Sequence, residues 1–136
     1  MTSVSEAILK IVPRAGSAEG TTKLNYAAGI SVESVGAKKI SMQIMVIPPG
    51  GKAEVHSHGR HETAAYIISG EIGVWFGENL EHHLTGGPGD FAYIPGKVPH
   101  QPYNLSDTEP AVMVIARTDP NEQENVVLLP ALENLH

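Results

Sequence analysis

The chain has 136 residues and contains no cysteine, which excludes disulfide frameworks, thiolate metal sites and cysteine nucleophiles. Positive charge is also scarce, because nine Lys and Arg residues face fifteen Asp and Glu residues and give a formal net charge of −6. No basic cluster is longer than Lys38-Lys39. Domains that bind nucleic acid usually carry a basic patch, so we expect no nucleic-acid partner.

Long apolar runs are absent as well. No stretch approaches the roughly 18 to 20 apolar residues that span a bilayer, and the N-terminus shows no basic region leading into an apolar run. We therefore expect no membrane partner and a cytoplasmic location. A hydrophobic content of 41% and a charged content of 18% are ordinary for a globular protein. The length fits one domain, 1–136, with a buried core.

The sequence also lacks helical periodicity, since no segment keeps a 3.6-residue apolar period over ten or more positions. Short apolar segments punctuated by glycine and proline take its place. The predicted strands cover residues 7–12, 39–47, 65–68, 71–76, 81–84, 91–94, 100–103, 111–116 and 126–129. Many short strands with such breaks favour an all-β sandwich or barrel. In the strand at 39–47, even-numbered residues from Ile40 to Val46 share one face, and Ser41 and Gln43 share the other.

The stretch from Gly50 to Gly70 is the most informative in the chain. It contains three of the seven histidines, followed closely by a carboxylate: His56, His58, His61 and Glu62. If residues 56–58 are extended, the two flanking imidazoles point to the same side. Imidazole suits zinc, copper, iron and nickel, and an added carboxylate is typical of non-haem iron sites. The stretch therefore predicts half of a divalent-metal site.

A second stretch, residues 89–104, supplies the other half. A glycine turn leads into an apolar strand, a Pro-Gly break follows, and a lone histidine, His100, precedes Asn104. Here the sequence resembles the cupin family. The first cupin motif, G-x5-H-x-H-x3,4-E-x6-G, is matched at or next to Gly50, His56, His58, Glu62 and Gly70. The second, G-x5-P-x-G-x2-H-x3-N, is matched at Gly89, Pro95, His100 and Asn104.

This resemblance implies a double-stranded β-helix, the jelly-roll barrel of cupins. It implies a divalent transition metal (iron, manganese, nickel or zinc) inside the barrel, bound by His56, His58, Glu62 and His100. Residues that could line the pocket are Met42, Met45, Tyr66, Trp75, Phe91 and Tyr93. The two motifs would lie between an N-terminal arm of about residues 1–36 and a C-terminal strand and tail of about residues 118–136. Small cupins usually form homodimers, for which the terminal strands 8–12 and 126–129 are candidates.

Two positions depart from the family pattern. Lys97 replaces a glycine of the second motif, and Glu62 has an ambiguous register. Counting forward from His58 places Glu62 at the ligand position, whereas counting back from Gly70 places Thr63 there. A one-residue bulge before Gly70 would reconcile the counts. Without it, Glu62 turns outward, and the site uses His61 or only three histidines.

The resemblance and the predicted site together favour a metal-dependent enzyme that acts on a small oxygen-rich molecule, in the manner of a dioxygenase. Glu62, Tyr66 and His61 are the candidates for acid or base roles. Two alternatives remain open. One is a non-catalytic module that binds or senses a small molecule or a metal, and the other is an isomerase or epimerase of the kind that acts on sugars.

Overall fold

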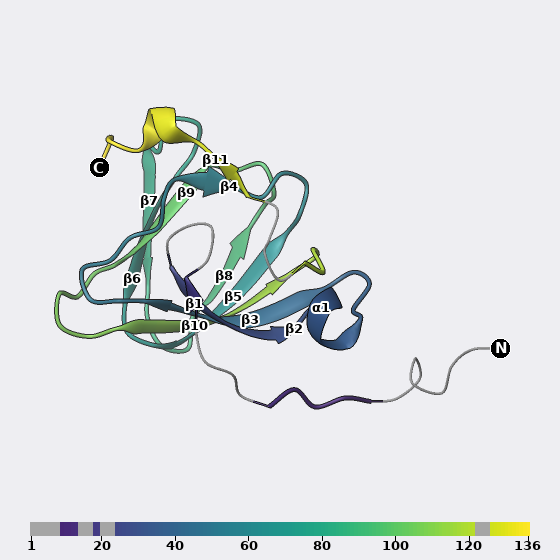
Figure 1. Ribbon diagram of the computed structural model, residues 1–136. Coiled ribbons are helices and arrows are strands. Elements are labelled where there is room, and N and C mark those ends of the chain that lie inside the picture. The colour runs from purple at the N-terminus through teal and green to yellow at the C-terminus, as the bar shows by residue number, and fades with distance from the viewer. Residues whose placement is uncertain (1–8, 14–17, 20–23, 122–125) are drawn as a thin grey trace.

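The computed structural model describes residues 9–13, 18–19, 24–121 and 126–136, and its strands form two antiparallel sheets (Figure 1). The six-stranded sheet runs in the order β1 (Ala18–Glu19), β2 (Asn25–Ile30), β3 (Ser41–Ile47), β10 (Ala111–Arg117), β5 (Thr63–Ser69) and β8 (Phe91–Ile94). The five-stranded sheet runs in the order β11 (Val127–Leu128), β4 (His56–Ser57), β9 (His100–Asn104), β6 (Ile72–Phe76) and β7 (His82–Gly86). The predicted all-β jelly roll is confirmed.

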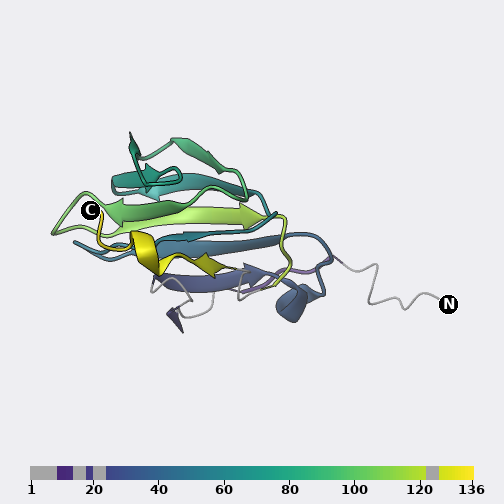
Figure 2. The same ribbon diagram turned by 90° about the horizontal axis from the view of Figure 1, so that it is seen from above.

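Most predicted strands match an observed one, with ends that differ by one or two residues. The predicted N-terminal strand is the exception. Residues 7–8 lie outside the described part of the chain, and residues 9–13 have no regular structure. A four-residue helix, α1 (Val32–Val35), was not predicted. It lies beside β2, outside the sheets (Figures 1 and 2), and Ser31 and Ser34 form a capping box at its start.

The hydrophobic core lies between the two sheets. It is built from inward-facing residues of β3, β5, β6 and β10 together with neighbouring loops: Leu24, Met45, Ile47, Ala53, Ala65, Ile67, Ile72, Ala111, Met113 and Ile115. In β3 the alternation is as predicted, but the inward face is the one that carries Ser41 and Gln43. Met42, on the other face, is 46% exposed. Along β3, the inward-facing residues therefore change from apolar at one end to polar at the other.

The polar end of the six-stranded sheet's inward face is formed by residues from three neighbouring strands. Arg117 closes β10 and pairs with Ser41 of β3 on one side and with Thr63 of β5 on the other. All three residues are buried. This end of the six-stranded sheet faces the strands that carry the histidines, so the barrel interior has an apolar region and a polar region.

A close backbone contact joins the loops of the two histidine motifs. The amide N–H of His58 donates to the carbonyl oxygen of Gly96 at 2.9 Å. A Cβ atom on Gly96 would lie 2.4 Å from the carbonyl oxygen of Gly59, so only glycine allows the loops to approach this closely. Lys97, the departure from the second motif, is exposed and does not have a positive φ, so it does not disturb this turn.

None of the helices in the described ranges has the length and apolar character needed to cross a membrane.

Candidate metal centre

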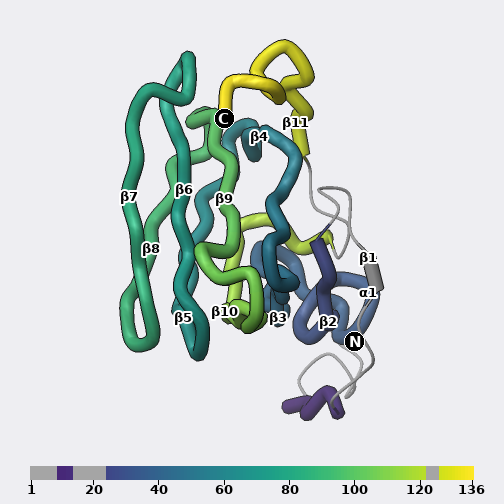
Figure 3. The backbone as a smooth tube through the Cα atoms, turned by 90° about the vertical axis from the view of Figure 1, so that its left-hand side faces the viewer, coloured from purple at the N-terminus to yellow at the C-terminus, as the bar shows by residue number. Residues whose placement is uncertain are grey.

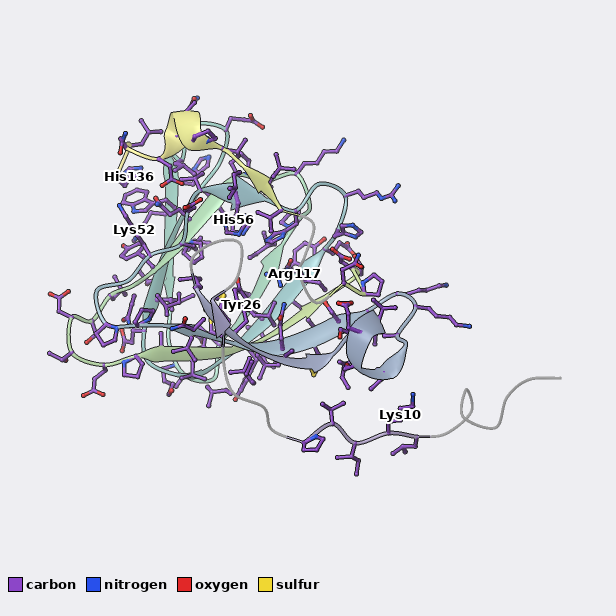
Figure 4. The ribbon with its side chains drawn as sticks, viewed as in Figure 1. Lys10, Tyr26, Lys52, His56, Arg117 and His136 are labelled. Atoms are coloured by element: carbon purple, nitrogen blue, oxygen red, sulfur yellow. The ribbon has the colours of Figure 1, made fainter. Side chains whose placement is uncertain are left out.

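Three histidines converge inside the barrel. His56 of β4 lies directly opposite His100 of β9, and His58 follows β4 by one residue. One ring nitrogen from each histidine can be chosen so that all three lie within 4.8 Å of one another. The three side chains are almost completely buried, with exposed fractions of 1% to 3%. Figure 4 shows His56 pointing into the interior of the barrel.

The short strand β4 is held from both sides. It lies between β9 on one edge and β11 on the other (Figure 3). In the pairing with β11, Leu128 is opposite His56. Next to it, the amide N–H of Val55 donates to the carboxylate of Glu133, and the Val55 carbonyl accepts from the amide of Leu129 at 3.0 Å. The C-terminal segment thus fixes the backbone that positions His56.

Backbone carbonyls orient two of the imidazoles. Nδ1 of His56 lies 2.6 Å from the carbonyl oxygen of Glu54, and Nδ1 of His100 lies 2.9 Å from that of Val98. A carbonyl oxygen only accepts, so each Nδ1 carries the proton and each Nε2 keeps a lone pair. This is how metal-binding histidines are commonly oriented.

His58 shows most directly that the cluster fits a metal. Both of its ring nitrogens are buried and have no hydrogen-bond partner. An unsatisfied buried polar group costs free energy, on the order of 1–3 kcal/mol. A cation bound between the three imidazoles would remove that cost, so the residues present fit a divalent transition metal.

The protonation state agrees with this fit. Burial is the largest cause that lowers the pKa of each histidine, and it brings the pKa of His58 to about 2 and that of His100 to about 4. The pKa of His56 is also lowered well below its usual value, by burial and then by the nearby His100. The Arg117 guanidinium lowers all three pKa values further. The imidazoles are therefore neutral at pH 7, which is the form that binds metals.

The structure does not bring Glu62 into the cluster. Its side chain is exposed and accepts a hydrogen bond from the Tyr93 hydroxyl at 2.8 Å. The neighbouring Thr63 is the buried residue at this point of β5. The β5–β10 ladder does shift register opposite Val112 and Met113, but this irregularity leaves Glu62 outside. The geometry is that of the three-histidine alternative.

His61 also lies outside the cluster. Its Nδ1 lies 3.0 Å from the carbonyl oxygen of Thr118, and its Nε2 lies 3.9 Å from the carboxylate of Asp119.

Asn104, the last residue of the second motif, has a structural role. Its side-chain amide donates to three backbone carbonyls, those of Ile47, Pro48 and Glu109, and so closes the turn after β9.

Arg117, beside the cluster, was not predicted from the sequence, whereas Thr63 is the residue that the count back from Gly70 placed at the ligand position. Arg117 is 6% exposed, and its Nε donates to the Thr63 hydroxyl at 3.2 Å. The only sequence signal for Arg117 is its position in the alternating pattern of β10, in which every second residue, such as Met113 and Ile115, is buried. A charged residue in phase with a buried row is unusual, because burying a charge is costly without partners.

A cavity of about 590 Å³ opens beside the histidines, with His56, His100, Thr63 and Arg117 in its wall. Of the six residues expected to line a pocket, Met45, Phe91 and Tyr93 do so, although Phe91 and Tyr93 are 82% and 64% exposed. The other three do not. Met42 and Tyr66 point outward, with exposed fractions of 46% and 39%, and Trp75 stacks on His136 at a ring distance of 3.6 Å.

Comparison with known proteins agrees with this architecture. The family model described as a cupin domain matches residues 43–117, more than half of the chain. The chain belongs to the cupin family. Among curated proteins, Germin-like protein 3-1 of Oryza sativa subsp. japonica is 30% identical over 86 residues, which cover 62% of this chain and 38% of that protein.

Solved cupin structures share the fold at lower identity. Oxalate decarboxylase of Lactobacillus farciminis, in a formate complex, has a TM-score of 0.70 at 24% identity and matches 85% of this chain and 34% of that one. An oxalate oxidase has a TM-score of 0.70 at 20% identity and matches 92% of this chain and 64% of that one. The chain thus spans less than two thirds of each of these relatives. At this identity the likeness shows a common fold.

Proposed function

We propose that this cupin is a metal-dependent enzyme in which His56, His58 and His100 bind a divalent transition metal and a small molecule binds in the adjoining cavity. The observation that carries the proposal is the convergence of three buried, neutral imidazoles, two of which, those of His56 and His100, line the cavity. A metal held by three protein ligands keeps open positions, at which it supplies Lewis-acid or redox chemistry to a bound molecule.

The residues of the chain have distinct parts in this proposal. The carbonyls of Glu54 and Val98 hold the His56 and His100 rings in the metal-binding orientation. Thr63 and Arg117 stand at the cavity wall beside these rings, where they can contact a bound ligand. The acid–base candidates Glu62, Tyr66 and His61 do not line this cavity, so we assign them no catalytic role.

The dioxygenase-like reaction is our first choice of chemistry. An isomerase would need a general base close to the metal, and no carboxylate of the described residues joins the histidine cluster. The same observation keeps a non-catalytic binding module as the second candidate, because such a module needs the metal and the cavity but no base. We also propose that the protein is a homodimer, for which light scattering over a wide concentration range is the test.

The first experiment measures metal in protein purified without chelators or affinity-column metals. We expect near-stoichiometric metal in the wild type and in the control His82→Ala, because His82 is exposed on β7. His56→Ala and His100→Ala should lose it. Oxygen consumption by the iron-loaded protein, screened with small carboxylates and enols, then separates the enzyme from the binding module. Failure of the wild type to take up iron, zinc, nickel or manganese would overturn the proposal.

A further inference from the structure

The cavity wall is divided into a polar end and an apolar body. The polar end is formed by His56, His100, Thr63 and Arg117. The apolar body comes from the inward rows of the sheets and includes Met45, Ile67, Ile72, Met113 and Ile115. Asp90 also lines the cavity, but one carboxylate oxygen of this residue accepts from the amide of Gly87 in the turn before β8. The polar end and the apolar body together match a ligand with one polar head and an apolar remainder.

Arg117 gives the polar end its charge. Its guanidinium stays protonated even when buried, because its pKa lies far above neutrality. It lies in the cavity wall inside the barrel, as does His56 (Figure 4). A guanidinium offers a planar fork of N–H donors that matches the two oxygens of a carboxylate. The chemistry of the wall thus favours an anionic head group over a neutral one.

The histidine cluster increases this preference. In the described residues it contains imidazoles and no carboxylate, so a divalent ion bound there would keep its full double charge. Thr63, the buried residue beside the cluster, adds no negative charge either. A head group lying between this ion and Arg117 would be stabilised by both positive charges.

We infer that the cavity selects an amphipathic carboxylic acid, with its carboxylate held between Arg117 and the metal centre and its apolar chain or ring packed along the apolar body. This inference rests on the proposed function, because it names the class of molecule bound at the same site. A cavity of about 590 Å³ falls within the usual range for small-molecule sites. An acid as small as oxalate would leave the apolar body uncovered.

The test compares three probes on zinc-loaded protein by titration calorimetry: hexanoate, its neutral isostere hexanamide, and acetate. Charge-assisted hydrogen bonds predict that hexanoate binds at least about tenfold more tightly than hexanamide. Burial of four further methylene groups predicts that acetate binds about 100-fold or more weakly than hexanoate. Equal affinity for hexanoate and hexanamide would show that the site does not select an anionic head group. Acetate binding as tightly as hexanoate would show that the apolar body does not contribute to binding.

Substitutions then locate the head group. Arg117→Gln should lower the preference for hexanoate over hexanamide several-fold, to the preference that the zinc ion alone gives. Arg60→Gln, on an exposed arginine of the His58–His61 loop, should leave the preference unchanged. If the preference for hexanoate over hexanamide is the same in Arg117→Gln as in the wild type, Arg117 does not hold the carboxylate. If Arg117→Gln fails to fold by circular dichroism, Arg117→Lys takes its place, and a several-fold fall in this preference is expected because the forked donor is lost.

Zinc content measured on the same samples separates this inference from the proposed function. Stoichiometric zinc without selective hexanoate binding would overturn the inference alone. Selective, Arg117-dependent hexanoate binding in protein that takes up no metal would overturn the proposed function and support the binding of an amphipathic acid by Arg117.

Discussion

The inward-facing residues of strand β10 lie in two different environments. At one end its inward residues Ala111, Met113 and Ile115 belong to the hydrophobic core, and at the other end Arg117 lies beside three buried histidines. The first region stabilises the barrel by removing apolar surface from water. The second buries polar groups, including a histidine with no hydrogen-bond partner, and this opposes folding. The comparison indicates that the polar end is retained for binding rather than for stability.

The largest expected effect is on the apolar region. Ile67 is 1% exposed in the core, so Ile67→Ala should lower the free energy of unfolding by about 2–5 kcal/mol through lost transfer energy and enlargement of the cavity that Ile67 lines. Urea denaturation measures this loss. Metal content per folded molecule should stay stoichiometric, because Ile67 is not part of the histidine cluster. A loss below about 1 kcal/mol would contradict the division of the interior into two regions.

Acid should destabilise the metal-free protein through the polar region. His58 and His100 stay neutral in the folded state down to pKa values of about 2 and about 4, whereas unfolded histidines protonate near their usual pKa of 6.5. Below pH 6.5 the unfolded state therefore binds more protons, and stability falls as the pH falls. The expected loss is on the order of 1–2 kcal/mol per histidine by pH 5.

Chemical denaturation of the metal-free protein between pH 7.5 and 5 measures this slope. The matched control is His82→Gln, which removes an exposed histidine and should leave the slope unchanged. His100→Gln should reduce it. A stability that is flat over this range in the wild type would contradict the account of the three neutral imidazoles.

His58→Leu should separate stability from metal binding. The leucine fills a similar space and removes two unsatisfied ring nitrogens, so the metal-free protein should become more stable by about 1 kcal/mol. At the same time, zinc affinity should fall by more than about 100-fold, because a direct ligand is lost. Thermal unfolding with and without zinc measures both effects. A variant that is clearly less stable without metal would show that His58 has a structural role instead.

The smallest effect is expected at Glu62. Because this side chain is exposed and lies outside the cluster, Glu62→Gln should change stability by less than about 0.5 kcal/mol. Zinc stoichiometry should stay the same. Loss of zinc from Glu62→Gln, with zinc kept by the matched exposed variant Glu71→Gln, would show that the glutamate moves into the site when metal binds.

The resemblance to the two cupin motifs predicted the barrel and four ligands, of which His56, His58 and His100 converge in it and Glu62 does not. His56 and His58 are two residues apart in an extended segment, so their side chains point to the same side. The turn at Gly96 brings the second motif against the first. These are local features, so the sequence carries them directly. The confirmed strands follow from the same local signals, namely short apolar runs bounded by glycine and proline.

The remaining features depend on which face of a strand turns inward. In β3 the alternation was correct, but polarity alone does not show that Ser41 and Gln43 face the interior. The register of Glu62 and Thr63 depends on the irregularity near the end of β5, and a single sequence permits either count. Arg117 was missed because a charged residue at the end of an apolar strand resembles an ordinary strand boundary.

The most direct test of the central claim is a crystal structure of zinc-loaded protein with anomalous scattering at the zinc edge. The account predicts one zinc ion about 2.0–2.1 Å from a ring nitrogen of each of His56, His58 and His100, with Glu62 still bonded to Tyr93. A zinc ion bound by the Glu62 carboxylate, or bound away from these histidines, would contradict it.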